Sequence, residues 1–438
     1  MTALKQPSHS NAILLTILVF GFVLAGPQNQ VFAATLCVNP GGTNGCYASI
    51  KAAVAAASPY DTIQVASGTY PEFVVVPKPL SLVGQDASNT IVDATGLANA
   101  FYVDGLDNHG LANVTITGFT AENANFEGIA ITNSSVVRIW GNNVVNNNRA
   151  LDVQQKSCPG LPSWETEEGF DCGEGIHISG VDHSVVAANF ISMNAGGILL
   201  SDDTGMTHDN LISENIAQDN PYDCGITLAS HPPASLPSGA APASPYGLLH
   251  NVIYNNTSQR NGLGQAGAGA GVGIFDAIAN GKNNGNVVIG NTLIGNGLPG
   301  VAMHSHSSGE QLNDNIIAGN TISNNGPDTG DAGTPGTAGI DVFGVSAVTG
   351  TVISQNTFSS QDIAIVAHTP AEVDASLNNL VANGLNLGIA NIGLGSVDAT
   401  QNWWGCSKGP GGQGCSTLSG LGSLIIRFTP WLTAQFTH

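Results

Sequence analysis

Paired carboxylates and recurring imidazoles are the side chains of this sequence that could carry out acid–base chemistry. Asp202 and Asp203 follow the segment Leu199-Leu200-Ser201, and pairs of carboxyl groups cleave glycosidic bonds in most glycoside hydrolases. Imidazoles exchange protons near neutral pH and serve as general acids or bases. We therefore predict six catalytic residues: Asp202, Asp203, His177, His231, His304 and His306.

Aromatic rings and further carboxylates occur in the same part of the sequence. Aromatic faces can cover the apolar faces of a sugar, while a few polar groups fix its hydroxyls. The predicted substrate-binding residues are Asp152, Phe275, Asp276, Asp341 and Phe343.

Two alternating repeats would position these residues. One is a Gly followed by a branched aliphatic residue, and its closest copies are 22, 27 and 28 residues apart. The other is an Asn followed by a short apolar run. The copies of the first are Gly128-Ile129, Gly175-Ile176, Gly197-Ile198, Gly225-Ile226, Gly273-Ile274, Gly300-Val301 and Gly339-Ile340. The Asn copies begin at Asn143, Asn189, Asn215, Asn291, Asn320 and Asn356.

A coil of this length holds three short strands, and Asn residues at equivalent turns can stack in hydrogen-bonded ladders. A leucine-rich repeat has a similar period but would show Leu-x-x-Leu-x-Leu, and β-propeller repeats are longer. Disorder requires low hydrophobicity, whereas 42% of these residues are hydrophobic. The repeats predict an all-β fold, a single-stranded parallel β-helix.

The alternation of side chains along a strand places Ile176 and Ile178 in the core and His177 outside. One predicted outward column contains Asp152, His177, Leu199, Thr227, Phe275, Ala302 and Asp341. The next contains Gln154, Ser179, Ser201, Ala229, Ala277, His304 and Phe343. Insertions at residues 155–173, 231–246, 260–272 and 326–337 are expected to form the walls of a groove over these columns.

The two ends of the repeat array are expected to be capped, because open sheet edges pair with other chains. The Ala-rich segment 49–57 predicts a short helix over the first coil, whose strands are expected at 62–65, 72–76 and 80–83. The predicted regions are a cap with the first coils at 34–110, repeat coils at 111–400 and a C-terminal cap at 401–438.

Three segments make a family resemblance specific. Ser49-Ile-Lys-Ala-Ala-Val, Asp61-Thr-Ile-Gln-Val-Ala-Ser-Gly-Thr-Tyr-Pro-Glu72 and Leu80-Ser-Leu-Val-Gly84 resemble the opening coil of pectin-lyase-like repeat proteins. Gln401-Asn-Trp-Trp-Gly405, followed by Gly409-Pro410, resembles the last coil of secreted members. The resemblance spans most of the chain after residue 33 and implies a right-handed β-helix.

The resemblance implies a secreted protein that binds and processes a polysaccharide as a lyase, an epimerase or a glycoside hydrolase. Asp202-Asp203 is similar to the paired Asp of polygalacturonases, but their Asn-Thr-Asp, Gly-His-Gly and Arg-x-Lys segments do not occur here. A lyase or epimerase also needs a cation near the substrate, and no catalytic Arg motif is recognisable. The alternative is a non-catalytic scaffold that binds glycans or mediates adhesion, because fold alone does not determine function.

The N-terminal residues predict export. Lys5, the apolar run 12–25 and Val31-Phe32-Ala33 have the order of a signal peptide at residues 1–33. The run is shorter than the roughly 20 residues that span a membrane. Without residues 1–33 the chain has 9 Lys and Arg against 31 Asp and Glu, a net charge of −22. This charge opposes nucleic acid as a partner and favours neutral or calcium-bridged glycans. A monomer is expected.

Seven cysteines in an exported chain predict disulfides. The short spacings favour the pairs Cys37–Cys46, Cys158–Cys172 and Cys406–Cys415, which leave Cys224 over. Zinc binding by cysteines is not expected, because the sequence contains no CxxC or CxxH.

The sequence predicts no bound metal, although His304 and His306 lie on one strand edge and His177 and His231 fall nearby. Alternate residues of a strand are usually simple neighbours. Calcium held by Asp202 and Asp203 is the one cofactor that the residues suggest.

Overall fold

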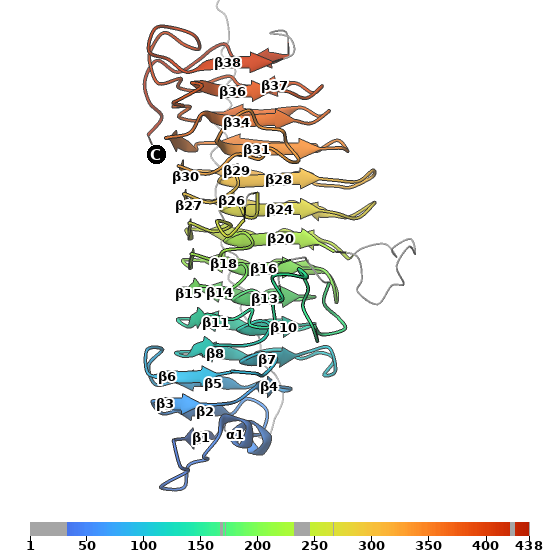
Figure 1. Ribbon diagram of the computed structural model, residues 1–438, viewed down its shortest axis with the longest axis vertical. Helices are drawn as coiled ribbons and strands as arrows, with labels where there is room; N and C mark the ends of the chain where they lie inside the picture. Colours follow the sequence, from blue (N-terminus) through green and yellow to red (C-terminus); the bar gives the residue numbers. More distant parts are fainter. Residues whose placement is uncertain are drawn as a thin grey trace, which may run out of the picture. The chain divides into compact units, whose positions relative to one another are not determined.

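Short strands with buried aliphatic residues wind the chain into stacked coils (Figure 1). The computed structural model describes residues 33–166, 170, 172–231, 246–265, 267–420 and 425–437. The predicted signal peptide, apart from Ala33, lies outside the described residues. In the part of the chain that is described, no helix is both long and apolar enough to cross a membrane.

The first of three long parallel sheets, sheet 1, carries the predicted site residues. It has 12 parallel strands, whose register shifts at Leu387–Ile389 where β36 pairs with β38. β24 begins at Val272 rather than Ile274. The strands are β4 (Val74–Val76), β7 (Phe101–Asp104), β10 (Ile129–Thr132), β13 (Ile176–Ser179), β16 (Ile198–Ser201), β20 (Ile226–Ser230), β24 (Val272–Asp276), β28 (Val301–Ser305), β31 (Ala338–Gly344), β34 (Ile363–His368), β36 (Leu387–Asn391) and β38 (Thr417–Gly420).

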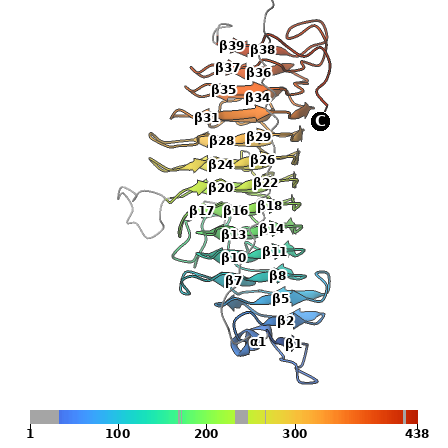
Figure 2. The same cartoon turned by 180° about the vertical axis from the view of Figure 1, so that it is seen from behind.

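Sheet 2 has 14 strands and follows sheet 1 in each coil (Figure 2). Its strands are β1 (Thr35–Val38), β2 (Thr62–Val65), β5 (Ser81–Gly84), β8 (Thr115–Thr117), β11 (Arg138–Trp140), β14 (Val185–Ala187), β18 (Leu211–Ser213), β22 (Val252–Tyr254), β26 (Val287–Ile289), β29 (Ile316–Ala318), β32 (Thr351–Ser354), β35 (Val373–Ser376), β37 (Val397–Asp398) and β39 (Ile426–Arg427).

Sheet 3 has 10 strands and closes each coil before the chain returns to sheet 1. Its strands are β3 (Gly68–Tyr70), β6 (Thr90–Asp93), β9 (Thr120–Glu122), β12 (Asn143–Val145), β15 (Phe190–Ser192), β19 (Ile216–Gln218), β23 (Thr257–Gln259), β27 (Thr292–Ile294), β30 (Thr321–Ser323) and β33 (Thr357–Ser359). A small fourth sheet contains β17 (Thr207–His208), β21 (Leu248–Leu249) and β25 (Asn283–Asn284).

Buried asparagines join the coils at their corners, as the second repeat predicted. Asn256 is typical: its side-chain amide donates to Asn291 Oδ1 at 3.0 Å and to Ile212 O at 2.9 Å. Its own Oδ1 accepts from the amide of Asn215 at 3.0 Å. The ladder residue of the first such coil is Asn142 rather than the predicted Asn143, which begins β12. Stacked amides thus satisfy the buried backbone at each turn.

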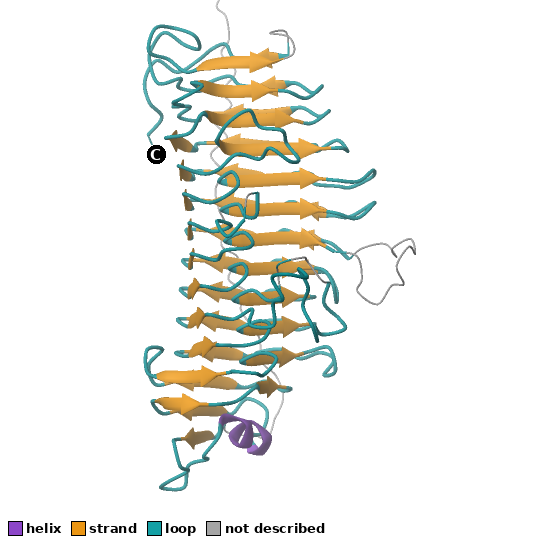
Figure 3. Cartoon of the chain, in the orientation of Figure 1, coloured by secondary structure: helices purple, strands orange, loops and turns teal. Residues whose placement is uncertain are grey.

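The N-terminal cap confirms the predicted helix. Helix α1 (Ile50–Ala56), purple in Figure 3, packs Ile50, Ala53 and Val54 against the first coil. Ser49 caps its N-terminus, and Glu72 accepts the backbone N–H groups of Ile50 and Lys51. The predicted first-coil strands correspond to β2, β4 and β5.

The C-terminal segment and the disulfides also agree with the sequence. Trp404 is fully buried in the core, and Asn402 forms the last rung of an asparagine ladder. The three predicted disulfides are present, and Cys224 is a buried free thiol.

Candidate functional site

Sheet 1 is buried on its outer face as well as its inner face. Strands of the other sheets alternate buried and accessible residues, as β11 and β12 do. In β13, β16, β20 and β28 every residue is buried. The loops beside sheet 1 therefore enclose its outward polar side chains, and those side chains form the candidate site.

A first cluster surrounds His304 on β28. The strand register sets His304 between Phe275 of β24 and Phe343 of β31. His304 Nε2 lies 3.1 Å from Asp341 Oδ2 and 3.1 Å from Asp328 Oδ2. The structure thus brings four predicted residues together and adds Asp328, which the sequence analysis did not select.

The two carboxylates keep the His304 ring charged. Burial lowers the pKa of His304, but Asp341 and Asp328 outweigh it and raise that pKa to about 10. Burial raises the pKa of Asp341 to about 6, although His304 opposes this rise. Burial also acts on Asp328, yet hydrogen bonds from His304 and from backbone N–H groups hold its pKa well below the usual range. At neutral pH an imidazolium therefore lies between two carboxylates.

A pocket of about 440 Å³ opens beside this cluster, and we call it the His304 pocket. This volume lies within the usual range of small-molecule sites. Asp331, on the insertion before β31, has a half-exposed carboxylate between two imidazoles. Its Oδ2 lies 3.3 Å from His306 Nε2 and 3.8 Å from His304 Nδ1. Phe275 lines the pocket, whereas Phe343 packs against His304 and His306.

A second cluster contains the predicted residues His177, Asp203 and His231. His231 Nδ1 lies 3.2 Å from Asp203 Oδ2, and His177 Nε2 lies 2.8 Å from Ser201 Oγ. Burial raises the pKa of Asp203, but the two imidazoles outweigh it and hold that pKa well below the usual range. The cavity between these side chains has a volume of about 10 Å³, which suits a water or an ion but no sugar.

Three glutamates that the sequence analysis missed surround the other side of His177. Its Nδ1 lies 3.8 Å from Glu127 and 3.5 Å from Glu165, and Glu174 completes the group. Burial and the neighbouring carboxylates raise the pKa of Glu165 well above its usual value. Glu165 comes from the insertion before β13, which the Cys158–Cys172 disulfide closes. We call these four residues the Glu127 cluster.

Two predicted acids lie inside a turn rather than in the pocket. Asp202 accepts hydrogen bonds from Ser230 Oγ and from the backbone N–H groups of His231 and Gly247. Burial and the charge of Glu310 raise the pKa of Asp276 to about 8. Both carboxyl groups are inaccessible, so their predicted catalytic and binding roles remain predictions.

The predicted outward columns were wrong at four positions, two in each column. Thr132 lies beside Ser179 in place of Gln154, and Gly273 lies between Thr227 and Ala302 in place of Phe275. Asp152 lies in the insertion before β13, where it pairs with Ser157, and Ala130 takes its predicted place beside His177. Phe275 pairs with Ala229 and His304, so it belongs to the second column in place of Ala277. The insertion at 155–173 therefore precedes a sheet 1 strand, and most of 231–246 lies outside the described residues.

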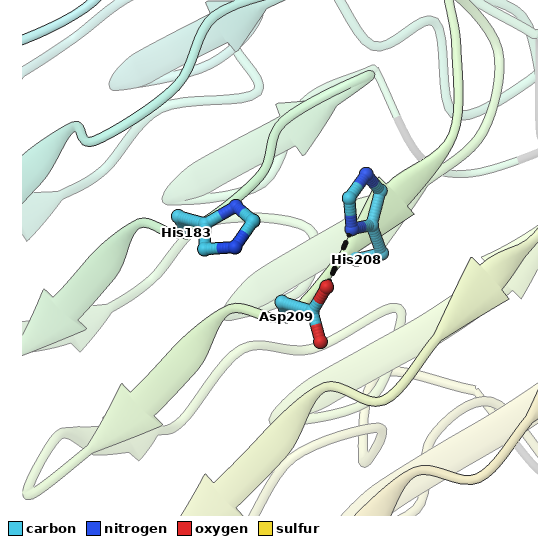
Figure 4. Close-up of side chains that lie close together, drawn as sticks. All are labelled: His183, His208 and Asp209. Carbon is cyan, nitrogen blue, oxygen red and sulfur yellow. Dashed lines mark hydrogen bonds and ion pairs between the residues drawn. The ribbon is translucent and has the colours of Figure 1, made fainter. Parts of the chain in front are cut away.

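A separate, exposed group of imidazoles lies at the turn between sheets 1 and 2. Two adjacent coils carry Asp182-His183 and His208-Asp209. Figure 4 shows His208 Nδ1 bonded to Asp209 Oδ2, at 2.8 Å, with the His183 ring nearby. These side chains could also ligate a metal ion.

Comparisons with known proteins agree with the coil geometry. A family model described as a right-handed β-helix region matches residues 84–236. The chain has the fold of a right-handed parallel β-helix. No curated protein sequence matches it.

Solved structures similar to this β-helix include DFA-IIIase from Arthrobacter chlorophenolicus A6 in complex with GF2. The two are 14% identical over 89% of this chain and 97% of that one, with a TM-score of 0.55. The same enzyme without its lid gives 13% identity, 90% and 98% coverage and a TM-score of 0.56. The A-module of Azotobacter vinelandii mannuronan C-5 epimerase AlgE4 gives 14% identity, 88% and 94% coverage and a TM-score of 0.45.

One sequence signal could have revealed the missed glutamates. Glu127-Gly128-Ile129 and Glu174-Gly175-Ile176 occupy the same place in successive coils of the β-helix. A carboxylate repeated directly before the core strand was therefore visible in the sequence. Glu165 and Asp328 carry no such signal, because they lie on insertions whose course the repeat does not determine.

Proposed function

We propose that this protein is a secreted glycan-processing enzyme that hydrolyses glycosidic bonds of a neutral polysaccharide in the His304 pocket. The observation that carries the proposal is the position of Asp331, an accessible carboxylate between His304 and His306 in a pocket of about 440 Å³. A carboxylate and a proton donor beside one sugar-sized space are the groups that hydrolysis needs.

The hydrogen bonds suggest a role for each group. His306 Nδ1 faces the backbone oxygen of Asp276 at 3.2 Å, and its Nε2 faces Asp331. Each ring nitrogen of His306 therefore faces an acceptor oxygen. In the proposed reaction Asp331 takes a proton from the attacking water while His306 gives one to the departing glycosidic oxygen.

His304 would act as a fixed positive charge. Asp341 and Asp328 hold its ring from behind, so its orientation does not have to change during the reaction. The sugar ring becomes oxocarbenium-like in the transition state, so this charge would act on the departing glycosidic oxygen, where negative charge develops. The charged His304 ring would also supply the cation that a lyase or an epimerase needs near its substrate and that no Arg motif of the sequence provides.

The charge of the pocket nevertheless favours a neutral substrate. Asp223, Asp328 and Asp331 line it, and no Lys or Arg lines it in the described part of the chain. Acidic polysaccharides would be repelled by such a lining. Phe275 offers an aromatic ring to a sugar face. The likeness of fold to DFA-IIIase, solved with GF2, is consistent with this class of reaction. The disulfides support secretion.

The test is a panel of fructan, xylan, mannan, alginate and pectin, assayed for reducing-sugar release and for absorbance of unsaturated uronates. Reducing ends from a neutral glycan, lost in Asp331→Asn, would support the proposal. Unsaturated products would indicate a lyase instead. Binding without product would favour the non-catalytic scaffold.

A further inference from the structure

We propose that the Glu127 cluster is a binding site for one first-row divalent cation, such as Zn²⁺ or Mn²⁺, with Glu127, Glu165, Glu174 and His177 as ligands. One ligand atom from each residue lies within 4.8 Å of all the others. Two ligands of the same tetrahedral zinc ion lie about 3.3–3.6 Å apart, given bonds of about 2.0–2.2 Å. Small side-chain movements would therefore complete the coordination.

Burial is the first argument for a cation. The side chains of Glu127 and His177 are at most 1% exposed, and that of Glu165 is 7% exposed. Among the described residues, no Lys or Arg forms an ion pair with Glu127 or Glu165. Buried carboxylates are stable only when they are paired, protonated or bound to a metal. The single charge of His177 cannot neutralise both Glu127 and Glu165.

Unsatisfied ligand atoms give an independent second argument. Among the described residues, neither carboxylate oxygen of Glu127 has a hydrogen-bond partner, and the same is true of His177 Nδ1. His177 Nε2, its other nitrogen, contacts Ser201 Oγ at 2.8 Å. A metal-bound histidine commonly has its second nitrogen fixed in this way. With Nε2–H donating to Ser201 Oγ, the Nδ1 lone pair would be directed toward the glutamates.

The adjoining cavity has the size of an ion or a water. Its volume is about 10 Å³, and Glu165, Glu174 and His177 form part of its lining. Three carboxylates and one imidazole suit Zn²⁺ or Mn²⁺ better than Ca²⁺, because calcium takes six to eight oxygen ligands and no imidazole. The site differs from the predicted calcium pair Asp202 and Asp203 and from the His304 pocket.

The insertion that carries Glu165 would be fixed by the metal. It is already held by the Cys158–Cys172 disulfide, by Trp164 stacked on Tyr102 and by a 2.6 Å bond from Thr166 Oγ1 to Asp203 Oδ1. Its loop thus places Glu165 over β10 and β13 without depending on the ion. The two other glutamates are held by equivalent positions of adjacent coils.

The experiment measures metal binding to the complete exported protein, produced without a polyhistidine tag. After dialysis against a chelator, Zn²⁺ and Mn²⁺ are titrated separately by equilibrium dialysis, with Ca²⁺ as a comparison. The variants are Glu127→Gln, Glu165→Gln and, as a matched control, His183→Asn combined with His208→Asn. The control removes the exposed imidazoles of Figure 4.

We expect one tight site for Zn²⁺ or Mn²⁺ that persists in the control. Either glutamine variant should weaken it more than about 100-fold, because loss of mere outer-shell partners already costs about 10–100-fold. Glu165→Gln leaves every coil residue unchanged, and circular dichroism verifies the fold of each variant. Absence of tight binding, or binding that only the control abolishes, overturns the proposal.

Discussion

His304 Nε2 lies 3.1 Å from Asp341 Oδ2, across two neighbouring strands whose residues are 37 positions apart in the sequence. The contact depends on the coil length, because each strand of sheet 1 must present its outward residue beside that of the next coil. It joins a buried cation to a buried anion directly beneath an open pocket. The ion pair is therefore the part of the pocket whose removal has the clearest consequences.

Loss of the His304 charge should change how stability depends on pH. A folded-state pKa of His304 raised from 6.5 to about 10 means that protonation of His304 stabilises the fold fully below pH 6.5 and that this contribution is lost as the pH approaches 10. Asp328, whose pKa is held well below the usual range, remains its charged partner. The free energy of unfolding of the wild type should therefore fall between these values. Denaturant unfolding from pH 6 to 10 should show a smaller decrease for His304→Gln than for the wild type.

The exposed His183→Gln is the control for this measurement. Its side chain is 63% exposed and lies away from the His304 pocket, so its stability should follow the wild type at every pH. Parallel curves for His304→Gln and the wild type would contradict the assigned charge of His304.

Asp331 and His306 should be needed for turnover but not for folding. Asp331→Asn removes the proposed base, and removal of a general base typically costs about 10²–10⁴-fold in rate. The turnover number on a glycan that the panel identifies should fall by that factor, with little change in melting temperature because Asp331 is half-exposed. His306→Gln should behave similarly. Asp314→Asn, on an exposed turn before β29 that does not line the pocket, is the matched control. An equal loss in that variant would refute the assignment.

Phe275 should contribute to substrate binding rather than to the chemical step. Its ring lines the pocket and is only partly buried, as expected of a surface that a sugar covers. Phe275→Ala should raise KM by roughly tenfold, because the sugar would no longer bury the apolar surface of the ring. The effect on kcat should be smaller. Unchanged KM on the same glycan would place the substrate elsewhere. The exposed Leu263→Ala serves as the comparison.

The repeats predicted the fold well, for a physical reason. Every coil needs inward Ile and Val at a fixed spacing and stacked Asn at its corners. The same pattern of residues therefore recurs in the sequence of each coil. Asn215 and Asn291 were therefore recognised from the sequence, whereas Asn256, which lies between them in the ladder, was not, because Thr257 and Ser258 follow it instead of an apolar run. The register at β24 was predicted two residues late, because Gly271-Val272 and Gly273-Ile274 both fit the pattern.

The site was harder to predict because half of it lies outside the repeat. His304, Phe275 and Asp341 were selected from strands, and the structure brings them together. Asp328, Asp331 and Glu165 lie on insertions, whose return onto sheet 1 depends on turns and a disulfide rather than on any period. Asp202 was predicted as an accessible acid but is buried, and a sequence pattern does not distinguish these two environments.

The asparagine ladder should carry a large share of the stability. Asn256→Ala removes the contacts to Asn215, Asn291 and Ile212 and leaves buried partners unsatisfied. Each such group costs about 1–3 kcal/mol. The free energy of unfolding of Asn256→Ala should therefore fall by several times as much as that of a surface variant. Asn255→Gly is the control, since Asn255 is exposed and has a positive φ of 55°. Equal melting temperatures for the two variants would show that the asparagine ladder does not contribute this stability.

The Cys158–Cys172 disulfide should tune the affinity of the proposed metal site. Its 14-residue separation closes the insertion that carries Glu165, and opening such a loop restores chain entropy worth up to about 3 kcal/mol. Metal binding would then have to order a more flexible insertion, and this cost in entropy would weaken the coordination by Glu165. The double variant Cys158→Ser with Cys172→Ser should bind Zn²⁺ or Mn²⁺ at least tenfold more weakly, while circular dichroism shows an intact β-helix. The double variant Cys37→Ser with Cys46→Ser removes the disulfide that precedes α1. It should leave the affinity for the metal unchanged. A fall of equal size in both double variants would mean that the affinity follows global stability and not the position of Glu165.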